Sequence, residues 1–349
     1  MKKGMCVFGT RSEAIKMCPL TNEIIRFIIF LLITTIVCSQ VVFSLQKRNS
    51  HIDELYNMRN CDVLVLGSSH AYVNLNGAVM YDNYGIASSC IAQGEQQIRM
   101  SYYSLKSALR YCNPQVVVFE VYMAAIEDDY GDLPNQYANA LLSFPIYSNL
   151  DVRLEAMGDL KGTNYIEYIS GIPLYHNDYK KWYSEGSKKE HTAGFMNGFT
   201  ETKDDGLWDY CFSVDTVSNK KEIGEQTRRA LLSTIELCKQ KNINLVFVIT
   251  PYQAPDYHME KLLSVQDIAL EYGIPFVDMN CHLGDIGINL EEDMYDWGHA
   301  KKIGEEKNSI WLGNWLVSNY SLKDHRGESD YKYWDIVSQE RIEWVSTLQ

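Results

Sequence analysis

The stretch 62-DVLVLGSSH-70 decides the fold of this chain, because a continuous apolar run ends there in one glycine and two serines. Uninterrupted apolar residues of this length are typical of a strand that is buried on both faces, as in a parallel sheet. A glycine followed by small polar residues indicates a tight turn where the strand ends. The sequence therefore predicts a first core strand at 62–66 whose carboxyl end presents serine hydroxyls at one edge of a sheet.

Further strands and helices alternate after this first strand. We predict strands at 84–87, 116–119, 245–249 and 276–278, and helices at 98–111, 222–241, 259–272 and 299–317. Gly273 stands where the third of these helices should end. Such alternation predicts an α/β fold with a mostly parallel sheet, in which ligands bind beyond the carboxyl ends of the strands. The weakly periodic residues 123–217 are predicted to be an insertion of helices and loops.

An apolar run precedes this α/β region. Residues 27–45, FIIFLLITTIVCSQVVFSL, contain no charged side chain, and as a helix they would span roughly 28 Å, close to the thickness of a bilayer core. We predict a transmembrane helix at 24–45, a stalk at 46–60, an α/β domain at 61–320 and a C-terminal tail at 321–349. Basic residues before the run favour a cytoplasmic amino terminus and an extracytoplasmic body. A cleaved signal peptide and a buried core helix are the alternatives.

Composition excludes several classes of function. The net charge of −13 argues against a nucleic-acid partner. The 9 cysteines are irregularly spaced and form no CxxC pair, so we expect no metal site and no disulfide framework. We also expect no organic cofactor. Cys61 and Cys112 lie beside predicted strands and are expected in the core. Glu291, Glu292 and Asp293 are expected to form a solvated loop.

The first residues, MKKGMCVFGTRSEAIKMCPL, resemble the opening of non-hydrolysing UDP-N-acetylglucosamine 2-epimerases. In that family such a segment ends the first strand and begins the first helix, with a proline where this chain has Ser12. The resemblance covers residues 1–20 only, so we interpret them as a cytoplasmic remnant without an epimerase site. An epimerase-related fragment is the literal alternative. Since such epimerases supply sugars for surface polysaccharides, the resemblance suggests that setting by association.

The second informative motif, 296-DWGH-299, lies just before the last predicted helix. A serine hydroxyl needs a neighbouring base to take its proton, and a carboxylate can orient an imidazole that does so. Asp296 and His299 are close enough in sequence for one loop to hold both. Together with the serines after the first strand, they predict a Ser-His-Asp hydrolase or acyltransferase.

This pair of motifs resembles the SGNH/GDSL hydrolase superfamily over about residues 62–317. The resemblance implies a three-layer sandwich with a flavodoxin-like sheet. It also implies that Ser69 is the nucleophile, with His299 as base and Asp296 as acid. The amides of Ser69 and Gly94 would form the oxyanion hole. Ser68 stands where the family has aspartate.

One block departs from that family. Where the superfamily carries Gly-x-Asn-Asp, with an asparagine that donates to the oxyanion, this chain has Phe119-Glu120-Val121-Tyr122. The residues expected to line the pocket are Ser68, His70, Gln93, Glu120 and Tyr122.

The sequence thus predicts a membrane-anchored, extracytoplasmic serine esterase or O-acyltransferase. Its expected substrate is an acylated cell-surface polysaccharide, with acetyl as the favoured group, or another ester. A membrane-bound acyltransferase is a candidate partner. The rival hypothesis is a non-catalytic partner in polysaccharide assembly that keeps the fold without a complete oxyanion hole.

Overall fold

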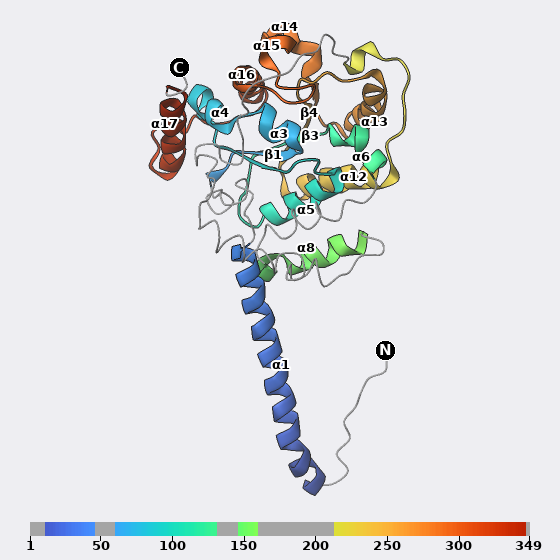
Figure 1. Cartoon of the computed structure of the whole chain (residues 1–349), viewed down its shortest axis with the longest axis vertical. Helices are drawn as coiled ribbons and strands as arrows, with labels where there is room; N and C mark the ends of the chain where they lie inside the picture. The colour runs from blue at the N-terminus through green and yellow to red at the C-terminus, as the bar shows by residue number, and fades with distance from the viewer. Residues whose placement is uncertain (1–10, 46–59, 131–145, 160–212, 347–349) are drawn as a thin grey trace.

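Five parallel strands form one sheet in the order β2-β1-β3-β4-β5. The computed structural model describes residues 11–45, 60–130, 146–159 and 213–346 (Figure 1). The strands are β1 (Val63–Gly67), β2 (Ser88–Ala92), β3 (Val116–Glu120), β4 (Asn244–Ile249) and β5 (Phe276–Asp278). The predicted α/β class and parallel sheet are confirmed. Because the chain leaves β1 toward β2 on one side and later reaches β3 on the other, β1 and β3 flank the point where the strand order reverses.

The prediction of a strand at 84–87 is wrong. Tyr84 ends helix α4 (Gly77–Tyr84), and Gly85 caps that helix in the left-handed conformation at φ 70°. The Gly85 amide donates to the Tyr81 carbonyl, which closes the helix in the way that glycine allows. The second strand begins only at Ser88. Its first residues are small and polar yet buried, so hydrophobicity gave no sign of them.

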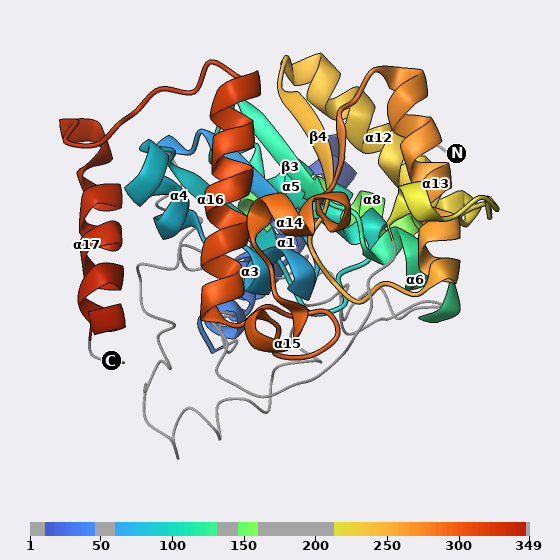
Figure 2. The same ribbon diagram turned by 90° about the horizontal axis from the view of Figure 1, so that it is seen from above.

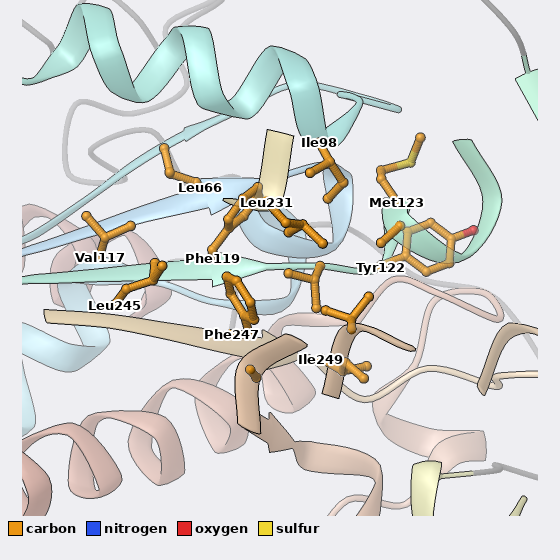
Figure 3. Close-up of a cluster of buried hydrophobic side chains, with 14 of the residues drawn as sticks. Leu66, Ile98, Val117, Phe119, Tyr122, Met123, Leu231, Leu245, Phe247 and Ile249 are labelled. Carbon is orange, nitrogen blue, oxygen red and sulfur yellow. The ribbon is translucent and has the colours of Figure 1, made fainter. Parts of the chain in front are cut away.

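Helices pack on both faces of the sheet. Leu64 and Leu66 of β1 belong to one apolar cluster, together with residues of α5 (Ile98–Ala108), α12 (Glu225–Lys241) and α13 (Asp256–Tyr272). Figure 3 shows part of this cluster, in which the rings of Phe119 and Phe247 meet edge to face. Val63 and Val65 face the opposite cluster, with α3 (Ser69–Asn74), α4 and α16 (Lys302–Asn319). Burial on both faces explains why β1, β3 and β4 are mostly apolar.

The predicted helices are confirmed with shifted ends. The helix predicted at 98–111 ends at Ala108, and the one predicted at 222–241 begins at Glu225. Helix α13 begins earlier than predicted, at Asp256. It ends at Tyr272 and is capped by Gly273 with φ 67°, as expected. The last predicted helix begins at Lys302, so His299 lies in the loop that precedes it. Cys61 and Cys112 are buried in the core, as predicted.

The predicted insertion is only partly described, since residues 131–145 and 160–212 lie outside the described ranges. Its described parts are α6 (Met123–Tyr130), α8 (Ile146–Asp159) and the short helix η3 (Val214–Thr216). The start of α6 belongs to the core: Met123 and Ala124 are buried in the same apolar cluster as residues of α13. Helix α8 lies beside α5, joined by the ion pairs Lys106–Glu155 and Arg110–Asp151.

A long helix, α1 (Arg11–Leu45), projects away from the sheet and contacts α8 at one end (Figure 1). Its segment Leu20–Cys38 is long and apolar enough to cross a membrane, and none of it is buried in the structure. This exposure contradicts the alternative of a buried core helix. The epimerase-like residues from Arg11 onward continue directly into this helix, whereas residues 1–10 and the stalk at 46–59 lie outside the described ranges.

The C-terminal residues contain a docked helix where the sequence suggested a tail. Helix α17 (Lys332–Ser346) packs against α4 and lies at the outer side of the helices on that face (Figure 2). Trp334 is buried and stacks on Tyr81, with ring centroids 6.2 Å apart.

Candidate active site

Ser69, His299 and Asp296 form one hydrogen-bonded chain, which we call the triad. The Ser69 Oγ atom lies 2.8 Å from His299 Nε2. On the other side of the ring, His299 Nδ1 lies 2.8 Å from Asp296 Oδ2. Ser69 begins α3 directly after β1, and the other two residues lie in the loop between α15 (Leu290–Asp293) and α16. In Figure 2, α3 is seen beside α15 and the start of α16.

The loop that carries Asp296 and His299 is held by its own backbone. Asp296 Oδ1 accepts hydrogen bonds from the amides of Gly298, at 2.8 Å, and His299, at 2.9 Å. Met294 and Ala300 form an antiparallel bridge that closes the loop. Partial burial raises the pKa of Asp296, but the hydrogen bonds from the His299 ring and these amides outweigh it and leave the pKa below its ordinary value. An ionised Asp296 fixes the tautomer in which His299 presents Nε2 as a base toward Ser69.

Asn74, at the end of α3, ties this loop to the helix that carries Ser69. Its Nδ2 donates to the Gly298 carbonyl and to Thr250 Oγ1, both at 2.9 Å, and its Oδ1 accepts from the Ala300 amide at 2.7 Å. The side chain is fully buried. Sequence reasoning missed this residue. The only available signal was an amide side chain five residues after the serine, between two apolar residues.

His70 is buried beside the triad rather than exposed in a pocket. Its ring stacks on Tyr122, with centroids 3.7 Å apart, and meets the His299 ring edge-on at 5.4 Å. Burial, and secondarily the neighbouring His299, hold the pKa of His70 well below its ordinary value, so the ring is neutral. A Cβ at Gly298 would lie 2.5 Å from His70 Nε2. The glycine of the DWGH motif therefore permits the loop to lie directly against His70.

Glu120 lies beneath the turn between β1 and α3. Gly67 has φ 150°, and a Cβ there would lie 2.8 Å from Glu120 Cβ, so this position requires glycine. Glu120 Oε1 accepts from the Tyr122 amide at 2.9 Å, and Ser68 Oγ lies 3.5 Å from Glu120 Oε2. Burial raises the pKa of Glu120 to about 8. Ser68 is also fully buried, so it supports the turn and has no exposed surface.

The predicted oxyanion hole is less defined than the triad. The Val121 amide donates to the Val248 carbonyl and the Tyr122 amide to Glu120, so the block that lacks the asparagine has its backbone donors engaged within the fold. Gly94 lies in the exposed turn after β2, and the buried Gln93 precedes it. An oxyanion hole formed by the amides of Ser69 and Gly94 stays a prediction.

The acidic residues before the triad form the short helix α15 and not the predicted loop, and they are only partly solvated. Glu291 and Glu292 are exposed, as predicted, but Asp293 is buried. Asp293 Oδ2 accepts from the Asn289 amide at 2.7 Å and from Lys307 Nζ at 2.6 Å, which satisfies its charge. Within the described ranges, no group of three or more His, Cys, Asp or Glu side chains could hold a metal ion.

No family model and no curated protein sequence matches this chain.

Proposed function

We propose that this protein is a serine esterase or O-acyltransferase of SGNH type. The observation that carries the proposal is the continuous chain from Ser69 Oγ through the His299 ring to Asp296, with both contacts at 2.8 Å. His299 takes the Ser69 proton as Oγ attacks the ester carbonyl, and Asp296 stabilises the imidazolium. His299 then returns the proton to the leaving alcohol. Water, or a sugar hydroxyl, then attacks the acyl-serine while His299 takes its proton; the bond from the acyl carbon to Ser69 Oγ breaks, His299 passes the proton to Oγ, and the acid or new ester leaves.

The topology supports the SGNH assignment. The serine follows the first strand, the Asp-x-x-His loop precedes helix α16, and both lie at the carboxyl edge of the sheet. The strand order is that of a flavodoxin-like, doubly wound sheet, and helices cover both faces as a three-layer sandwich requires. Fold alone does not define activity, so the proposal depends on the three side chains.

The setting of the site suggests its substrate. An apolar helix at the amino terminus would anchor the body at a membrane, and the basic residues before it favour an extracytoplasmic body. An ester on a cell-surface polysaccharide is accessible to such a body. We therefore propose an acylated, most simply acetylated, glycan as substrate, reached with or without a membrane-bound acyltransferase partner.

A non-catalytic role in polysaccharide assembly is the second candidate. The feature that favours it is the block 119–122, where the family's asparagine is absent and the amides of Val121 and Tyr122 are engaged by Val248 and Glu120. An incomplete oxyanion hole would leave the tetrahedral intermediate unsupported.

The two candidates differ in the reactivity of Ser69. The full chain in detergent should react with a fluorophosphonate probe and hydrolyse p-nitrophenyl acetate. Ser69→Ala should abolish labelling and lower kcat by about 10³-fold or more, as loss of a triad nucleophile does. Ser68→Ala is the matched control, because the neighbouring hydroxyl is buried, and should keep the label. A folded wild-type chain that stays unlabelled would favour the assembly role, and labelling of Ser69→Ala would show that another residue is the nucleophile.

A further inference from the structure

Trp297 is an exposed aromatic side chain at the triad. It lies between Asp296 and His299 in sequence, and 40% of its surface is exposed. The triad side chains beside it are themselves partly open, with His299 at 24% and Asp296 at 34%. An indole in this position forms part of any surface that a substrate must cross to reach Ser69.

The backbone of Trp297 is fixed. Its carbonyl accepts from the Gln253 amide at 2.7 Å. The next amide, that of Gly298, donates to Asp296 Oδ1. The same short loop therefore positions both the carboxylate of the triad and the indole, so the indole has a defined place relative to Ser69.

Three rings support the indole from inside the protein. The Trp297 ring meets His70 and Tyr122 with centroids 5.8 Å apart and Tyr252 at 6.2 Å. These supporting rings are at most 5% exposed. They fill the space behind the indole, so among the residues that the structure describes its exposed surface is an open apolar platform beside the triad.

An open aromatic platform suits a ring and not a chain. A pyranose ring presents a face of C–H groups that packs on an indole, while its hydroxyls remain in water or carry an ester. A long acyl chain would instead need an enclosed apolar cavity. We propose that Trp297 is the specificity-determining residue of this site, stacking a pyranose ring of the acylated glycan so that its ester carbonyl reaches Ser69 Oγ. This inference rests on the proposed function and names its substrate class.

The test compares two acetate esters in the full-length protein. Glucose pentaacetate contains a pyranose ring, whereas triacetin is an acyclic polyol acetate. Trp297→Ala should lower the ratio of kcat/KM for the sugar ester to that for triacetin about 10-fold, mainly through KM, and Trp297→Phe should recover part of the ratio. Tyr272→Ala removes another exposed aromatic ring, from the end of α13 and not from the triad loop, and should leave the ratio as in the wild type.

Two outcomes would overturn the inference. Equal losses on both esters would mean that Trp297 only positions the triad loop. The ratio of kcat/KM for glucose pentaacetate to that for triacetin could stay unchanged in Trp297→Ala while the ratio for tributyrin to that for triacetin falls. That result would mean that the indole holds the acyl group.

Binding without turnover separates this inference from the catalytic proposal. In the Ser69→Ala background, glucose pentaacetate should quench tryptophan fluorescence, and adding Trp297→Phe should remove that quenching. Quenching that depends on Trp297, together with a wild-type chain that shows no esterase activity, would retain the sugar platform and reject catalysis. Quenching that is absent, or that persists without the indole, would reject the platform.

Discussion

Glu120 is a carboxyl group buried beneath the turn that presents Ser69, and burial raises its pKa from 4.5 to about 8. The folded protein thus keeps a proton on Glu120 at neutral pH, while the unfolded chain has lost it. The Glu120 side chain lies against the turn on two sides: its Cβ packs against Gly67, and its carboxyl lies 3.5 Å from Ser68 Oγ. Its protonation is therefore linked both to the stability of the fold and to the backbone that holds the triad serine.

Replacing Glu120 with Gln should remove a pH dependence of stability. As the pH rises from about 4.5 to about 8, the unfolded wild type ionises first, so its free energy of unfolding falls, by roughly 5 kcal/mol from this group alone. Above the folded pKa both states are ionised and this loss is complete. Urea unfolding at the two ends of the window should show a smaller fall in Glu120→Gln than in the wild type. Glu291→Gln, at an exposed carboxyl, is the control and should keep the wild-type slope; a slope in Glu120→Gln equal to the wild type would contradict the burial argument.

Residues that form local motifs were predictable, and those defined by distant partners were not. Ser69, Asp296 and His299 could be named because two short motifs resemble those of the SGNH/GDSL superfamily, and the structure brings the three side chains together. Asn74 could not, since its partner Gly298 is 224 positions away in the chain. Asp293 was placed in water because its neighbours in sequence are acidic, whereas Lys307 of α16 neutralises it inside the fold.

At the level of elements, the sequence predicted those whose apolar pattern is strong. Strands β1, β3 and β4 are continuous apolar runs, and their bounds were predicted within one or two residues. Strand β2 was misplaced because Ser88 and Ser89 are small enough to be buried without being apolar. The fold tolerates them because small side chains fit against helices; Ser88 Oγ, for example, lies 3.7 Å from Met80 Sδ.

Helix α17 is expected to stabilise the fold through one side chain. Trp334 is buried against Tyr81 of α4, whose hydroxyl donates to Asp335 Oδ1 at 2.9 Å. Trp334→Ala should lower the free energy of unfolding by about 3–5 kcal/mol, the usual loss for a large buried ring. Urea unfolding followed by circular dichroism measures this.

The matched control for Trp334 lies on the same helix. Ile336 is 47% exposed, so Ile336→Ala should change stability by no more than about 0.5 kcal/mol. If the two variants lost equal stability, α17 would be a loosely attached tail, as predicted for residues 321–349, and not part of the folded body.

The whole molecule divides into a helix and a body. The apolar run was predictable because a membrane span depends on composition and length. The full extent of its helix was not: a helix was predicted at 24–45, and α1 begins earlier, at Arg11, well before the span Leu20–Cys38. Polar flanking residues carry no apolar pattern, so the sequence did not indicate that they continue the helix. The large apolar side chains of the span are exposed, and a lipid environment would surround them with apolar chains in place of water.

Insertion in a membrane should depend on that span. The wild-type chain is expected to sediment with membranes, to resist carbonate extraction and to dissolve in detergent. Replacing Ile29 and Ile33 with Arg places two charges at the middle of the span, each unfavourable by about 3 kcal/mol, and should shift the protein to the carbonate-soluble fraction. The paired change of Leu150 and Leu154 to Arg, on exposed positions of α8, is the control and should leave the protein in the membrane. A wild-type chain that carbonate extracts would mean that α1 lies on the surface or is removed as a signal segment.

The side of the membrane that the body occupies follows from the same helix and can be read with one cysteine. Leu270 is 81% exposed at the end of α13, far in sequence from the span. Leu270→Cys should react with a membrane-impermeant maleimide in intact cells, above the background of the unsubstituted chain, because the body is expected outside. Ser12→Cys, on the other side of the span, should react only after permeabilisation. If both cysteines required permeabilisation, the body would be cytoplasmic, and a cell-surface glycan would no longer be within reach of Ser69.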